Sequence, residues 1–293
     1  MKIVVTGATG FVGTHLIHHL LEQNQEVVAS SHDLRKAERA SWYSKVHYVP
    51  YSLHSAPTDE NLFRRFDSPD ALIHLAWQGL PNYNSLHHIE ENVLSNYFFL
   101  KNFVRNGLKN LTVTGTCLEY GLQSGKLSEG MESRPSTAYA VGKHTLYCFL
   151  EILKNEIGFS LKWIRLFYLY GEGQASQSLL PQLERALAAG DESFPMSGGE
   201  QKRDFLPIKK ASLYISKIAE QTKQEGIINC CSGNPVSVKD FIHDYLQSKN
   251  KSIELNLGHY PYPAYEPMEF WGDNSKLQEI ITTNHERTVS TDR

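Results

Sequence analysis

Tyr139 and Lys143 are the two residues whose types and spacing best suit catalysis. They open a stretch with apolar residues at helical spacing, and residues four apart lie on one face of a helix. A free tyrosine has a pKa near ~10, which is too high for an efficient base at neutral pH, and a neighbouring ammonium lowers that pKa. We therefore predict that the pair exchanges a proton with a sugar or alcohol oxygen. The same spacing also occurs on ordinary solvated helix faces, so the pair alone is a weak signal.

A glycine-rich turn near the N-terminus supplies the second chemical feature. Gly7, Gly10 and Gly13 follow the apolar run Ile3–Val5 and precede apolar residues at helical spacing. This order predicts a buried strand, a tight turn and a helix whose free N–H groups bind a pyrophosphate. The contacts expected for a dinucleotide at this turn are Gly7, Gly10, Phe11, Val12 and Gly13. The alternative is a turn that only packs a helix against a strand and binds no ligand.

These two features occur in an order that resembles the extended branch of the short-chain dehydrogenase/reductase superfamily. The sequence T-G-A-T-G-F-V-G at residues 6–13 has the glycine spacing of that superfamily, and T-x-x-x-Y-G at residues 116–121 matches its catalytic turn. The resemblance implies that Thr116, Tyr139 and Lys143 are the catalytic set. In that set Thr116 orients the substrate oxygen, Tyr139 delivers the proton, and Lys143 binds the nicotinamide ribose and tunes the tyrosine.

The end of the second expected strand bears on the choice of cofactor. In dinucleotide folds an acid at this position favours NAD, and a nearby arginine accommodates the 2′-phosphate of NADP. Ser31 occupies the position and Arg35 lies close by, so we expect NADP(H) to be preferred, with NAD(H) possible. Asp33 is the observation against this preference. Further cofactor contacts implied by the resemblance are Leu75, Ala76, Trp77, Thr114, Tyr139, Lys143 and Phe167.

The residues after Thr116 narrow the expected reaction. Sugar-nucleotide dehydratases of the resembling family carry an Asp-Glu pair directly after the threonine, and this chain has Cys117 and Leu118 there, with Glu119 one place too late. We therefore expect NADPH-dependent reduction of a keto group on a nucleotide-linked deoxysugar, of the 4-keto-6-deoxyhexose type. A nucleotide-sugar 4-epimerase with retained NAD is one alternative, and a non-catalytic NADP-sensing binding protein is another. Substrate contacts implied by the resemblance are Tyr83, Thr116, Tyr168, Leu180 and Arg203.

The elements that must position these residues form an α/β fold. We predict a Rossmann-type, doubly wound parallel sheet over residues 1–170, and a small α/β substrate domain over residues 171–293. A strand near residues 227–232 is expected to rejoin the first domain. The resembling family forms dimers through two helices, here the expected helix at residues 90–106 and the helix that carries Tyr139, so a homodimer is expected.

Composition excludes several classes of partner. The chain has 293 residues, 41% hydrophobic and 21% charged, with a net charge of −3, which gives no electrostatic basis for nucleic acid or an anionic membrane. No apolar run approaches the ~20 residues of a membrane span. The four cysteines form no C-x-x-C pair, so we expect reduced thiols, no metal site and a cytoplasmic location.

Overall fold

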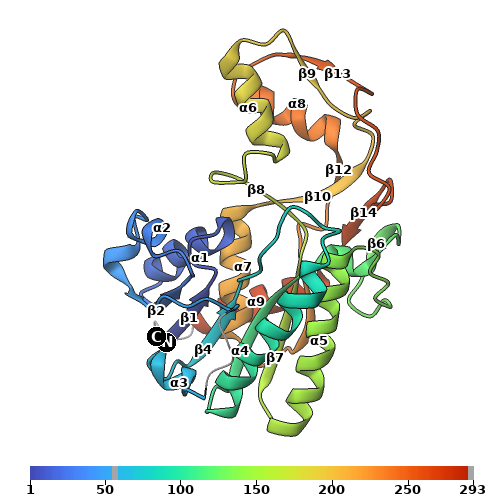
Figure 1. Cartoon of the computed structure of the whole chain (residues 1–293). Helices are drawn as coiled ribbons and strands as arrows, with labels where there is room; N and C mark the ends of the chain where they lie inside the picture. Colours follow the sequence, from blue (N-terminus) through green and yellow to red (C-terminus); the bar gives the residue numbers. More distant parts are fainter. Residues whose placement is uncertain (55–58, 290–293) are drawn as a thin grey trace.

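A seven-stranded parallel sheet is the centre of the structure, a computed structural model that describes residues 1–54 and 59–289 (Figure 1). Its strand order is β11-β7-β5-β4-β1-β2-β3, and every neighbouring pair runs parallel. The strands are β1 (Lys2–Thr6), β2 (Glu26–Ser30), β3 (His47–Tyr48), β4 (Ala71–His74), β5 (Asn110–Thr116), β7 (Ser160–Leu166) and β11 (Gly226–Cys230). The fold is therefore the expected Rossmann-type α/β architecture.

Helices cover both faces of this sheet (Figure 1). One face packs against α1 (Phe11–Glu22), α7 (Ile208–Glu220) and α9 (Ser275–Val289). The other packs against α3 (Leu62–Arg65), α4 (Val93–Arg105) and α5 (Ala138–Ile157). Strand β1 is a continuous apolar run because both of its faces are buried. Ile3 and Val5 pack into the core on the α1 side of the sheet, and Val4 packs into the core on the α4 side. A short helix, α2 (Leu34–Glu38), follows β2.

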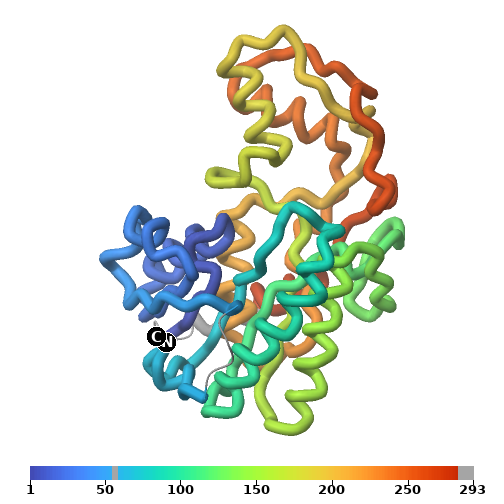
Figure 2. Tube along the Cα trace, in the orientation of Figure 1, coloured from blue at the N-terminus to red at the C-terminus, as the bar shows by residue number. Residues whose placement is uncertain are grey.

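A smaller body is built from two separate stretches of the later chain, drawn in yellow and in orange in Figure 2. Its core lies between α6 (Leu179–Ala189), α8 (Val238–Ser248) and a two-stranded sheet of β9 (Ser193–Pro195) and β13 (Glu254–Asn256). Two further sheets join the bodies. They contain β8 (Tyr168–Tyr170), β10 (Lys202–Pro207) and β12 (Pro235–Ser237), and β6 (Gly125–Leu127) with β14 (Phe270–Gly272).

The chain returns to the large sheet after visiting the smaller body. Strand β11 pairs in parallel with β7 at the sheet edge, Ile228 lying opposite Ile164. Helix α7, which precedes β11, packs Ile208, Ile215 and Ile218 into the same core as Ile3. The large sheet and its helices therefore need residues from both halves of the sequence.

The helix expected over residues 90–106 starts differently from a regular α-helix. A single π-helical turn spans His88–Asn92, and α4 proper runs from Val93 to Arg105. Such turns are rare and occur mostly at functional sites. Within residues 1–54 and 59–289, no helix is both long enough and apolar enough to cross a membrane.

Candidate active site

The glycine turn between β1 and α1 has the close packing that its sequence predicts. Gly7 adopts φ +68°, and a Cβ on it would lie 2.9 Å from the backbone nitrogen of Ala76. A Cβ on Gly13 would lie 2.3 Å from the Gly7 carbonyl oxygen. Helix α1 then begins after Gly10 with no side-chain cap on its first N–H groups. The turn thus leaves free backbone donors at a helix N-terminus, which suits a pyrophosphate.

A buried polar chain fixes the end of β4 beside this turn. The Thr6 hydroxyl oxygen accepts hydrogen bonds from the backbone N–H groups of Leu75 (3.2 Å) and Ala76 (3.4 Å), and it lies 2.9 Å from His74 Nδ1. His74 Nε2 lies 2.6 Å from Asn96 Oδ1. Burial lowers the pKa of His74 to about 3, so the ring is neutral and structural. Leu75 and Ala76 are thereby held directly under the turn.

A cavity of about 240 Å³ lies at the carboxyl ends of β1, β2 and β4, and it is lined by Gly7, Gly10, Ser31 and Lys36 among others. The Ser31 hydroxyl is 2.9 Å from the hydroxyl of Tyr48, so the end of β2 is neutral. Asp33 is the N-cap of α2, where its carboxylate accepts a hydrogen bond from the Lys36 backbone N–H (3.0 Å). Among the described residues lining the cavity, the charge at the ribose end is therefore that of Lys36.

The three residues of the expected catalytic set meet where β5 ends and α5 begins. Thr116 and Tyr139 line a second cavity of about 630 Å³. Lys143 lies one helical turn after Tyr139, fully buried, and its Nζ donates to the Thr114 carbonyl oxygen at 2.7 Å. The Thr116 hydroxyl oxygen accepts from the Leu118 N–H (3.3 Å), so its O–H can donate on the cavity side, where its hydrogen bond with Tyr139 opposes the rise in the tyrosine pKa.

The electrostatics of the pair differ from the sequence expectation. Burial raises the pKa of Tyr139 above its usual value, and the negative charges of its surroundings add to that effect. Burial also lowers the pKa of Lys143 to about 7, against an opposing effect of Glu119. The expectation that the ammonium lowers the tyrosine pKa is therefore wrong for this structure, because desolvation outweighs it. Tyr139 is a phenol at neutral pH.

Trp77 lines the smaller cavity and also contacts both Tyr139 and Lys143. Its ring lies 4.2 Å from the Lys143 ammonium, measured to the ring centroid, and 6.2 Å from the ring of Tyr139 in an edge-on arrangement. Its indole N–H donates to Nδ1 of His88 at 3.0 Å, and the His88 ring packs 5.3 Å from Tyr139. The indole therefore supplies the second contact of a buried cation.

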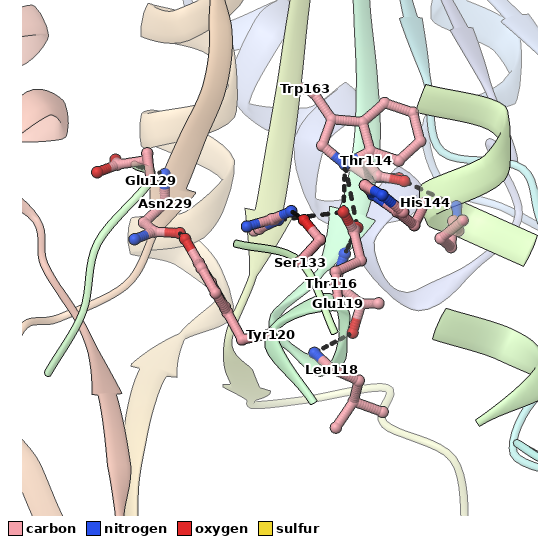
Figure 3. A network of polar contacts seen from close by, with 12 residues as sticks. Thr114, Thr116, Leu118, Glu119, Tyr120, Glu129, Ser133, His144, Trp163 and Asn229 are labelled. Carbon is pink, nitrogen blue, oxygen red and sulfur yellow. Dashed lines mark hydrogen bonds and ion pairs between the residues drawn. The ribbon is translucent and has the colours of Figure 1, made fainter. Parts of the chain in front are cut away.

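Glu119 holds the backbone of Thr116 in place. Its fully buried carboxylate accepts from the Thr116 N–H (2.8 Å), the Trp163 indole N–H (3.0 Å) and Arg165 Nε (3.1 Å). Figure 3 shows these groups converging beside the end of β5. The Glu119 side chain thus lies in the core and does not line the cavity, whereas Cys117 and Leu118 do. Burial raises the pKa of the Cys117 thiol, so neither residue serves as a base at neutral pH.

The second cavity is also lined by a buried ion pair. Arg203 donates to Glu266 from Nη2 at 2.9 Å and to the carbonyl oxygen of Lys202 from Nη1 at 2.9 Å. The Tyr168 hydroxyl also donates to Glu266. Arg203, for which the resemblance implies a diphosphate contact, is therefore paired within the protein, and its contact with substrate stays a prediction.

The residues expected from the sequence fall into three groups. Those that line the smaller cavity are Gly7, Gly10, Ser31, Leu75, Ala76 and Trp77. Those that line the larger cavity are Phe11, Tyr83, Thr116, Tyr139, Phe167, Tyr168, Leu180 and Arg203. Those that line neither are Val12, Gly13, Arg35, Thr114 and Lys143. Gly13, Thr114 and Lys143 nevertheless contact lining residues or support them, whereas Arg35 is exposed on α2.

Two charged residues that line the cavities were not chosen as contacts from the sequence. Lys36 replaces Arg35 at the ribose end because α2 turns Lys36 toward the cavity. Glu266 enters the larger cavity from the aromatic, proline-rich stretch at residues 260–267. The available signal was an acid inside a stretch that is otherwise aromatic and rich in proline.

Comparisons with known proteins agree with the fold of this chain. A sequence model described as the NAD dependent epimerase/dehydratase family matches residues 3–231. The dTDP-6-deoxy-L-talose 4-dehydrogenase (NAD(+)) of Aggregatibacter actinomycetemcomitans is 29% identical over 93% of this chain and 99% of its own length. The dTDP-4-dehydro-6-deoxyglucose reductase of Escherichia coli is 26% identical over 87% of this chain and 84% of its own.

A solved structure shows the same fold. The UDP-glucuronic acid 4-epimerase from Bacillus cereus, in complex with UDP-glucuronic acid and NAD, superposes with a TM-score of 0.80. The alignment covers 96% of this chain and 93% of the epimerase chain, with 24% sequence identity. This likeness concerns the fold alone.

Proposed function

This chain belongs to the NAD-dependent epimerase/dehydratase family, and from that premise we propose that it reduces the 4-keto group of a nucleotide-linked 6-deoxyhexose with NADPH. It is an oxidoreductase of the extended short-chain dehydrogenase type that acts on a nucleotide sugar. Two relatives are named for opposite directions of C4 redox chemistry on a dTDP-linked 6-deoxy sugar. The observation that carries the proposal is the convergence of Thr116 and Tyr139 on one cavity above Lys143.

A protonated Tyr139 suits the reducing direction. Burial keeps the phenol protonated at neutral pH, as a general acid requires when a carbonyl oxygen gains negative charge. The Thr116 O–H donates to the same oxygen and stabilises that charge. The dinucleotide, when bound, supplies the hydride. Lys143 lies one helical turn after Tyr139, and its ammonium form packs against the ring of Trp77.

Dehydration is not part of the proposal. The positions that would carry its acid and base hold Cys117 and Leu118, and Glu119 faces the core. Elimination of water needs a group that removes a proton from carbon, and a buried thiol with a raised pKa is a poor one at neutral pH.

The glycine turn fits a dinucleotide, because added Cβ atoms would fill its space. Membership of the family supports a nicotinamide dinucleotide, and the preference for NADPH over NADH is our proposal. It is supported by the neutral Ser31, by Lys36 in the cavity lining, and by the Asp33 carboxylate being engaged as a helix cap. NADH remains the alternative, since a relative is named for NAD(+).

A homodimer in the cytoplasm completes the proposal. Leu94, Phe98, Phe149 and Ile152 expose apolar surface on α4 and α5, the two helices that were expected to pack against a second copy. Ile152 is 70% exposed, which is unusual for a large aliphatic side chain outside an interface.

The test is consumption of NADPH or NADH with a panel of nucleotide-linked 4-keto-6-deoxyhexoses. We expect turnover with at least one substrate, loss of that turnover in Tyr139→Phe, and little change in Tyr147→Phe, a matched change farther along α5. Inversion of a stable nucleotide sugar without net use of NADPH would instead identify a 4-epimerase. Nucleotide binding with no turnover on any substrate would identify a binding protein.

A further inference from the structure

We propose that Glu266 makes the sugar end of the larger cavity selective for a neutral hexosyl group and against a hexuronate. The inference rests on the proposed function, because it requires that a nucleotide sugar occupies this cavity. It goes further by naming the residue that discriminates between a neutral and an acidic sugar.

The charges that line the cavity are few and already paired. Among the described residues that line it, the charged side chains are Arg203 and Glu266, whose nearest atoms are 2.9 Å apart. Their side chains are only 4% and 11% exposed. Arg203 also donates to the carbonyl oxygens of Lys202 (2.9 Å) and Met268 (3.2 Å). The guanidinium therefore has its counter-charge and most of its hydrogen bonds inside the protein.

The carboxylate lines the same cavity as Tyr139, and its charge acts on residues near the expected reacting centre: after burial, it adds to the raised pKa of Cys117, which follows Thr116, and of Tyr83. Glu266 accepts a hydrogen bond from the Tyr168 hydroxyl, which lines the same cavity. The neighbouring Tyr265 packs 5.7 Å from Tyr83, and Tyr83 packs 5.6 Å from Tyr139. A sugar whose C4 oxygen meets Tyr139 would therefore occupy the cavity that Glu266 also lines.

A sugar carboxylate would be poorly accommodated at this position. It would enter a largely apolar cavity beside a like charge, and the guanidinium that would otherwise attract it is held by Glu266. Juxtaposed like charges with restricted solvation are an effective way to reject a ligand. A sugar hydroxyl, in contrast, donates to the carboxylate, and a methyl group packs against the aromatic lining. The fitting class is a neutral hexosyl group that carries a hydroxyl donor.

The experiment measures binding to the full-length protein by calorimetry, so it does not depend on turnover. The ligands are two matched pairs, UDP-glucose with UDP-glucuronate and dTDP-glucose with dTDP-glucuronate, so that the base contributes equally within a pair. For the wild type we expect the glucuronate to bind at least about tenfold more weakly. In Glu266→Gln, which keeps the shape and removes the charge, the ratio should fall below about threefold or reverse.

A nearby change provides the control. Glu269 pairs with Lys202, its side chain is 46% exposed, and neither residue lines the cavity. Glu269→Gln removes the same charge as Glu266→Gln and should keep the wild-type binding ratio. If Glu266→Gln does not fold because Arg203 is left unpaired, the double variant Arg203→Gln/Glu266→Gln removes both charges and should lose the discrimination equally.

Three results overturn the inference. The first is equal binding of both members of a pair by the wild type, and the second is an unchanged ratio in the Glu266 variants. The third is that no nucleotide sugar binds at all, which overturns the proposed function together with this inference. The first two leave the proposed function standing, so the two failures are distinguishable.

Discussion

The buried carboxylate of Glu119 provides the sharpest test of how the catalytic turn is held. Replacing Glu119 with alanine removes the acceptor for the Thr116 N–H and the Trp163 indole N–H. It also leaves the Arg165 guanidinium without the carboxylate that balances its charge. Both side chains of the ion pair are fully buried, so water does not replace the lost interaction.

The size of the effect follows from this burial. Removing one partner of a buried ion pair costs about 3–5 kcal/mol, because the other charge stays desolvated and uncompensated. A chain of this length loses about 2 °C of melting temperature per kcal/mol. We therefore expect Glu119→Ala to melt about 6–10 °C below the wild type.

The assay is thermal unfolding followed by far-ultraviolet circular dichroism, with Glu132→Ala as the matched control. Glu132 pairs with Arg134 at 2.7 Å, but both side chains are about two-thirds exposed, at 71% and 67%. Exposed pairs contribute about 0–1 kcal/mol, so this variant should melt within about 2 °C of the wild type. High salt should leave the Glu119 effect intact, since buried pairs are screened much less than exposed ones.

A melting temperature for Glu119→Ala within about 2 °C of the wild type would refute the reasoning. It would mean that the Glu119–Arg165 pair is not part of the cooperative core. We also expect the variant to lose turnover at temperatures where it is folded, because the Thr116 backbone loses its anchor. Full turnover in a destabilised variant would show that Thr116 is positioned by other contacts.

Three further predictions concern the cofactor site and the buried lysine. Gly13→Ala places a Cβ 2.3 Å from the Gly7 oxygen, so dinucleotide affinity measured by fluorescence titration should fall, whereas Gly130→Ala, which meets nothing within 4 Å, should retain it. Ser31→Asp should raise the KM for NADPH relative to that for NADH, and an unchanged KM ratio would place the 2′-phosphate elsewhere. Burial lowers the pKa of Lys143 from 10.5 to about 7, so the folded protein releases this proton first and its stability should rise between pH 7 and pH 10. Lys143→Met should flatten that rise in urea unfolding and be more stable than the wild type below pH 7, and an unchanged profile would contradict the burial effect.

The elements with strong local patterns were predictable from sequence. The apolar run Ile3–Val5 is buried on both faces of the sheet, and the glycines after it mark a turn in which added Cβ atoms would clash. In each case neighbouring residues in the sequence determine the outcome.

Properties that depend on tertiary packing were not predictable. Spacing brings Tyr139 and Lys143 to one face of α5, but the direction of the tyrosine pKa depends on how completely that face is buried. The ion pair of Arg203 with Glu266 joins residues 63 positions apart, and no local pattern announces it. Likewise, Asp33 was expected as a possible ribose contact until the structure showed its carboxylate capping α2.

The return of β11 to the edge of the large sheet has a consequence for biosynthesis. The core beneath the glycine turn includes Ile208, Ile215 and Ile228, which a ribosome adds long after Ile3. A nascent chain truncated near residue 170 lacks β11 and the helices α7 and α9 that cover one sheet face. We therefore expect coenzyme affinity to arise late in translation. An amino-terminal fragment would expose the apolar face of the sheet that α7 and α9 cover, and we expect chaperones to bind it.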